Sequence, residues 1–107
     1  GKKALFQFGL HARELISPET GLRFVESLID GRAGAVAPPS SWEMKIIVNA
    51  NPLGRDETLS KEGCNRLNEN KVDLNRNFPV GFGRSNDDNN PTGPAAFSEP
   101  ETRILKR

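Results

Sequence analysis

Two short apolar runs that flank a segment with helical periodicity constrain the fold of this chain more than any other feature of its sequence. The first run, Ala4–Phe8, opens onto Gly9, and the second, Met44–Val48, ends in a turn sequence, so each is typical of a buried strand. Between them, apolar residues recur at helical spacing over residues 18–30. This order predicts an α/β fold with the two strands as neighbours and the helix on one face of their sheet.

Capping residues mark the ends of two helices. Ser17 is the expected N-cap of the first helix, Pro18 its first residue, and Gly31 its stop. A second helix is expected after Ser98, which forms a capping-box sequence with Glu101. The sequence thus predicts a helix after each of two serines.

The rest of the chain is polar and predicts loops. Residues 31–41 are small and rich in proline, which is typical of a surface connection. Residues 53–70 have no periodicity, and residues 73–78 are too polar for a core strand. Residues 81–93 are rich in Gly, Asn and Asp and predict an irregular loop.

Composition excludes several classes of function. The 107 residues have a formal net charge of +1 with scattered basic residues, which argues against binding nucleic acid or a membrane surface. No apolar run approaches the roughly 20 residues of a membrane span. A single cysteine, Cys64, excludes an internal disulfide and a cysteine-rich zinc module. The mean hydropathy of −0.59 is low for a self-sufficient core and raises the possibility of a fragment.

A histidine and a glutamate follow the first strand directly. His11 is the only histidine, and Glu14 lies three residues further on, where loops after buried strands often carry function. If the backbone curls there, an imidazole nitrogen and a carboxylate oxygen can bind one zinc ion, as in sites with two histidines and one glutamate. A solvated or hydrogen-bonded histidine is the alternative interpretation of the pair alone.

Arginines and asparagines form a second candidate site. Arg76 stands between Asn75 and Asn77, and its planar guanidinium matches a carboxylate in a bidentate fashion. These three residues belong to a polar block that begins at Asp73, and Arg66 lies seven residues before that aspartate. Alone, the block is better explained as a polar loop whose asparagines cap turns.

Four motifs in order change this interpretation, because together they closely resemble the zinc carboxypeptidases of the carboxypeptidase A/B and N/E group. They are GLHARELIS (9–17), NANPLGR (49–55), NRLNENKVDLNRNFP (65–79) and GPAAFSEPET (93–102). The resemblance covers essentially the whole chain. One departure is Leu53, where the family usually has aspartate.

The resemblance implies that His11 and Glu14 bind one zinc ion. The family's third protein ligand, a second histidine, is expected outside this chain, together with its catalytic glutamate and substrate-covering tyrosine. Residues 1–107 are therefore expected to be an N-terminal-side part of a catalytic domain, truncated at the C-terminal side and also at the N-terminal side. The implied fold is α/β, part of a mixed central sheet with flanking helices.

The resemblance also implies roles in substrate binding and catalysis. Asn75 and Arg76 match the pair that holds the terminal carboxylate of the substrate. Arg66 resembles the arginine that polarises the scissile carbonyl and stabilises the oxyanion. Arg13 resembles an arginine that lines an outer subsite.

The implied activity is that of a zinc-dependent carboxypeptidase acting on peptide or protein C-termini, with the isolated chain expected to be inactive. Three alternatives stay open: an inactive relative that binds peptide C-termini, a related zinc amidase with a non-protein substrate, and a non-enzymatic α/β interaction module. We expect a monomer with no nucleic-acid partner and no membrane span. The resemblance alone favours a secreted or extracytosolic location.

Overall fold

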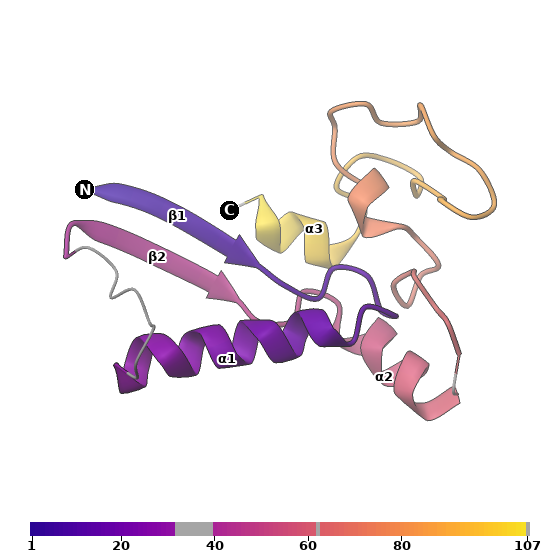
Figure 1. The fold of residues 1–107 in the computed structure, drawn as a ribbon. Coiled ribbons are helices and arrows are strands. Elements are labelled where there is room, and N and C mark those ends of the chain that lie inside the picture. The colour runs from indigo at the N-terminus through magenta and orange to yellow at the C-terminus, as the bar shows by residue number, and fades with distance from the viewer. Residues whose placement is uncertain (32–39, 62, 107) are drawn as a thin grey trace.

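The computed structural model describes residues 1–31, 40–61 and 63–106. Its elements follow the order strand, helix, strand, helix, 3₁₀ turn, helix (Figure 1). They are β1 (Lys2–Gln7), α1 (Ile16–Asp30), β2 (Trp42–Ile47), α2 (Pro52–Lys61), η1 (Leu74–Arg76) and α3 (Pro100–Leu105). The expected connection at residues 31–41 lies largely outside the described residues, whereas the loop expected at residues 81–93 has no helix or strand.

β1 and β2 pair in parallel, which confirms that the two apolar runs form neighbouring strands. Lys2 lies opposite Trp42 and Gln7 opposite Ile47. Each strand begins two residues before the predicted run and ends one residue before its end. The predicted α/β order is therefore confirmed.

α1 covers one face of this pair, as Figure 1 shows. The ring of Phe24 lies 5.2 Å from that of Phe6 and 6.2 Å from that of Phe8, measured between ring centroids. Gly21 permits this close packing, because a Cβ atom there would lie 2.8 Å from the Phe8 ring. The helix is thus held against the sheet by aromatic contacts.

The predicted start of α1 is wrong, and its predicted stop is right. Ser17 lies inside the helix, and Leu15 occupies the N-cap position without a side-chain cap. The hydroxyl of Ser17 instead accepts a hydrogen bond from the backbone N–H of Gly9 at 2.9 Å, which ties the exit of β1 to α1. Gly31 ends the helix with φ of 59°, a left-handed conformation that favours glycine.

α2 was not expected, because residues 53–70 lack apolar periodicity. Its start is nevertheless encoded: the Asn51 side chain accepts from the backbone N–H of Gly54 at 3.1 Å, and Pro52 is the first residue. Asn51 and Gly54 are buried against each other, since a Cβ on Gly54 would lie 2.5 Å from the Asn51 amide oxygen. Capping and close packing stabilise this polar helix.

The start of α3 also differs from the prediction by one residue. Glu99 is the N-cap and Pro100 begins the helix, whereas the Ser98 hydroxyl donates to the Glu99 carboxylate at 2.8 Å. Glu101 does not complete a capping box; its carboxylate accepts from the side chain of Asn68 at 3.3 Å. Both side chains are used in tertiary contacts instead.

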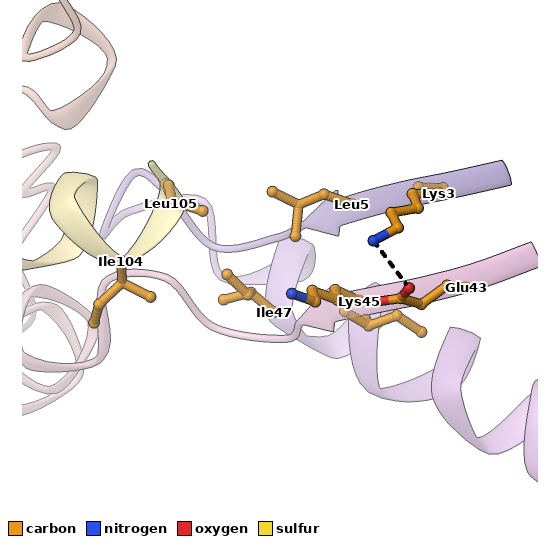
Figure 2. Close-up of a pocket in the computed structure, with 9 residues that line it drawn as sticks. Lys3, Leu5, Glu43, Lys45, Ile47, Ile104 and Leu105 are labelled. Atoms are coloured by element: carbon orange, nitrogen blue, oxygen red, sulfur yellow. Dashed lines mark ion pairs between the residues drawn. The ribbon is translucent and has the colours of Figure 1, made fainter. Parts of the chain in front are cut away.

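Among the described residues no helix covers the face of the sheet opposite α1, and this face forms an apolar groove with α3 (Figure 2). The groove has a volume of about 430 Å³, and Leu5 from β1 and Ile104 from α3 line it while remaining 51% and 61% exposed. An ion pair of 3.4 Å between Lys3 and Glu43 lies at one end. No helix in the described part of the chain is long and apolar enough to cross a membrane.

We expect a carboxylate on α2, that of Glu57, to make a pH-dependent contribution to the stability of the fold. Hydrogen bonds from Lys71 and then Lys61, both at 2.9 Å, lower the pKa of Glu57 from 4.5 to about 2. Because the folded-state pKa is the lower one, this contribution is present above pH 4.5 and is lost as pH falls toward 2. In the intact protein with chelator present, Glu57→Gln should lower the urea midpoint at pH 7, and the two midpoints should converge near pH 2.

Glu43→Gln is the matched control, because the Lys3–Glu43 pair is exposed and contributes little to stability. A difference between Glu57→Gln and the parent protein that stays constant from pH 7 to pH 2 would contradict the prediction.

Candidate metal and substrate site

The segment after β1 curls in the way that the paired ligands require. The backbone N–H of Glu14 donates to the carbonyl of His11 at 3.2 Å, which closes a tight turn. Nδ1 of His11 then lies 2.9 Å from Oε1 of Glu14. The His11 side chain is 10% exposed and that of Glu14 is 47% exposed. The imidazole ring is therefore mostly buried, whereas the Glu14 carboxylate is open to solvent.

A buried aspartate stands behind this pair. Asp73 is 0% exposed, and its Oδ1 lies 3.3 Å from Nε2 of His11. The same carboxylate accepts from the backbone N–H of Asn75 at 3.0 Å and, through Oδ2, from Nε of Arg66 at 2.8 Å. Asp73 therefore brings the histidine, the catalytic arginine candidate and the start of η1 together.

The loops that carry these residues are joined through their backbones. The N–H of Ala12 donates to the carbonyl of Arg66 at 3.2 Å. The buried side-chain amide of Asn51 donates to the carbonyls of Leu10 and Leu67, at 3.2 Å and 3.4 Å. Asn51 thus joins the loop that carries His11 to the loop that carries Arg66.

Sequence interpretation gave no site role to Asp73 or Asn51. Asp73 was part of a recognised block, but its partner His11 is sixty-two positions away, so only the folded chain reveals the contact. Asn51 belongs to the turn sequence that ends the second predicted strand, and nothing in that sequence indicates contacts with two loops.

Arg66 is half-buried between two acidic groups. Besides its hydrogen bond to Asp73, its Nη1 lies 3.9 Å from Oε1 of Glu14. Arg66 and Arg13 line one polar cleft of about 570 Å³ together with residues 64, 65, 67 and 88–90. The structure therefore brings the two arginines of the prediction into one depression next to the His11–Glu14 turn.

Asn75 and Arg76 lie in η1, directly after Asp73. Nη1 of Arg76 donates to the carbonyl of Asn75 at 3.3 Å, and its buried Nε has no hydrogen-bond partner among the described residues. In the same part of the chain no hydrogen bond joins either side chain to His11 or Glu14, and neither lines the cleft of Arg13 and Arg66. Their convergence on the His11–Glu14 pair stays a prediction.

The donor set at His11 and Glu14 fits part of a zinc site. It offers one imidazole nitrogen and one carboxylate oxygen, both common zinc ligands. A carboxylate near the far ring nitrogen, as Asp73 provides, is typical of histidines that bind metal through the other nitrogen. Within the described residues no group of three histidine, cysteine or acidic side chains could hold a metal ion by itself.

Comparison with known families decides the identity of this arrangement. The sequence profile described as zinc carboxypeptidase matches residues 1–107. This chain belongs to the zinc carboxypeptidase family. The comparison with curated protein sequences gave no match.

Several solved structures share the fold of this family member. Carboxypeptidase A from Helicoverpa armigera superposes with a TM-score of 0.84 at 28% identity over 98% of this chain. Thrombin-activatable fibrinolysis inhibitor gives 0.84 at 27% identity over 98%, and the bovine protein in complex with tick carboxypeptidase inhibitor gives 0.81 at 27% identity over 99%.

This zinc carboxypeptidase chain spans only 29%, 30% and 40% of the lengths of those three chains, in the same order. The α/β fold that the resemblance implied is thereby confirmed, and the described strands form a parallel pair within it.

Proposed function

We propose that the full-length protein is a zinc-dependent carboxypeptidase that hydrolyses the C-terminal peptide bond of peptides or proteins. This chain then supplies two zinc ligands and the anchor for the substrate carboxylate as part of the catalytic domain. The observation that carries the proposal is the 2.9 Å approach of His11 to Glu14 with the buried Asp73 behind the ring, in a chain of this family.

His11, through Nδ1, and Glu14 would hold the zinc ion, with a third protein ligand from outside this chain. When bound, zinc polarises a carbonyl and lowers the pKa of water to about 7. Asp73 keeps the His11 ring oriented, because its carboxylate faces the nitrogen that does not bind metal.

Arg66 stabilises the negative charge that develops on the scissile carbonyl oxygen. Its Nε is occupied by Asp73, which leaves the terminal nitrogens of the guanidinium free to donate toward the His11–Glu14 side. A donor fixed in advance stabilises the tetrahedral state more than the ground state, which accelerates the reaction.

Arg76 and Asn75 bind the terminal carboxylate of the substrate. A carboxylate at the chain end is the one feature that internal peptide bonds lack, and a bidentate arginine recognises it. At a fixed distance from the metal, this contact selects the last peptide bond. Arg13 lines an outer subsite in the cleft that it shares with Arg66.

The partners of the proposed enzyme are peptide or protein C-termini, and we propose that it acts as a monomer in a secreted or extracytosolic location. These proposals rest on the family, and the scattered basic residues support the absence of a nucleic-acid partner.

The test uses the purified full-length protein and a short peptide with a free C-terminus. We expect release of single C-terminal residues, loss of this activity on chelation, and recovery when one equivalent of zinc is returned. Stoichiometric zinc without hydrolysis of any peptide would favour an inactive binding relative. Hydrolysis of a non-protein amide alone would favour a zinc amidase.

A further inference from the structure

The carboxylate of Glu99, the N-cap of α3, is nearly buried and has no role in the site described above. Glu99 is 3% exposed, and its Oε2 accepts from the side-chain amides of Asn68 at 2.8 Å and Asn70 at 2.7 Å. Its Oε1 accepts from the Ser98 hydroxyl at 2.8 Å. Burial acts to raise the pKa of Glu99, but the hydrogen bonds from Asn70, Asn68 and Ser98 together outweigh it and lower the pKa below 4.5. The group is therefore an ionised, fully hydrogen-bonded carboxylate at neutral pH.

Through Asn68, Glu99 holds the loop that carries Arg66. Asn68 is 0% exposed; its backbone N–H donates to the carbonyl of Val72 at 3.0 Å, and its side-chain oxygen accepts from the N–H of Val72 at 2.9 Å. These two bonds close a short loop whose flanks are Arg66 and Asp73, joined at 2.8 Å. The carboxylate thus contacts the base of the loop that presents Arg66.

Through its own backbone, Glu99 also holds the turn that carries Arg76. Its N–H donates at 3.2 Å to the side-chain oxygen of Asn77, the residue directly after Arg76, and Thr102 donates to the same oxygen at 2.6 Å. Asn77 is 0% exposed. Its side-chain nitrogen donates to the Thr92 carbonyl, the Ala95 carbonyl and the Ser98 hydroxyl, at 2.8, 3.0 and 2.9 Å.

We propose that Glu99 is a positioning residue that fixes the Arg66 loop and the Arg76 turn relative to each other. The inference rests on the proposed function, in which Arg66 acts on the scissile carbonyl and Arg76 on the terminal carboxylate one residue away. Those two contacts require a fixed separation, and fully satisfied buried polar networks are rigid. A misplacement of about 1 Å at such a site can reduce the rate about 100-fold.

The first test replaces Glu99 in the zinc-loaded full-length protein. Glu99→Ala removes the acceptor that Asn68, Asn70 and Ser98 share. It should reduce kcat/KM for a free-acid peptide about 100-fold, with a lower kcat and a higher KM. Glu99→Gln should recover activity to within about 10-fold of the parent, because the amide oxygen still accepts from Asn68 and Asn70 while its NH₂ faces Ser98. Zinc content should not change in either variant.

Phe24→Leu is the control for general destabilisation, since Phe24 packs between α1 and β1 away from both arginines. It should lower Tm without changing KM. If Glu99→Ala only lowers kcat, as a smaller folded fraction would, and leaves KM unchanged, the proposal is overturned.

A second readout does not depend on peptidase activity. In protein labelled with ¹⁵N-arginine, the Nε–H of Arg66 should give a slowly exchanging signal, because it donates to the buried Asp73. Glu99→Ala should speed its exchange, and Asn70→Ala, which removes one exposed donor and is expected to fold, should do so more weakly. Absence of peptidase activity in the parent protein would refute the proposed function, whereas unchanged Arg66 exchange in the folded variants would refute the positioning role.

Discussion

His11→Ala in the full-length protein should abolish both bound zinc and peptidase activity. The imidazole supplies one ligand, and its ring lies between Glu14 and the buried carboxylate of Asp73 at 2.9 and 3.3 Å. His11 is the one histidine among the 107 residues, so this chain offers no second imidazole. Loss of a direct ligand should exceed the 10- to 100-fold effect typical of groups that only orient ligands, so we expect losses of more than about 100-fold. Zinc content by atomic absorption and the rate of C-terminal release measure the two effects.

Glu14→Gln should also weaken zinc binding, because an amide oxygen is a poorer zinc ligand than a carboxylate. The matched control is Glu19→Gln, which removes an exposed partner of Arg55 at the start of α1 and should retain zinc. Full zinc occupancy in His11→Ala would show that the metal site lies elsewhere.

Arg76→Ala should reduce hydrolysis of free-carboxylate peptides far more than that of peptides amidated at the C-terminus. The lost charge-assisted bidentate contact should raise the activation barrier by about 2–4 kcal/mol, or roughly 30- to 1000-fold in kcat/KM. Arg76→Lys should restore only part of the loss, since an ammonium keeps the charge but not the planar fork.

The comparison of the two substrates separates recognition from folding in this experiment. Arg84→Ala, at an exposed position of the loop at residues 81–93, is the control and should affect neither substrate. Equal losses on free and amidated peptides in Arg76→Ala would mean that Arg76 supports the fold instead of binding the chain end.

Local sequence patterns predicted the strands and α1 but not α2 or the starts of the helices. The strands and α1 were predicted because the sequence itself shows their apolar runs and their helical spacing of apolar residues. α2 buries only Gly54 and Thr58, so its stability depends on the Asn51 cap and on neighbours distant in sequence. Serine is a residue type favoured at N-caps, but the hydroxyls of Ser17 and Ser98 form hydrogen bonds with Gly9 and Glu99 instead.

The same distinction applies to the candidate site. His11 and Glu14 could be paired from the sequence because three residues of backbone bring them together. The contacts of Asp73 with His11 and of Glu99 with Asn68 span 62 and 31 positions, and they depend on how the loops pack. Sequence motifs indicated which segments form the candidate site. The side chains that connect those segments could be identified only in the folded chain.

The uncovered sheet face has a consequence for handling this chain in the laboratory. Within the described residues β1 and β2 each have a single strand partner, so each has an unpaired edge beside the apolar groove of Leu5 and Ile104. Unprotected edges next to exposed apolar surface are templates for intermolecular strand addition. Residues 1–107 produced alone are therefore expected to self-associate through these strand edges and to need a fusion partner or refolding from inclusion bodies.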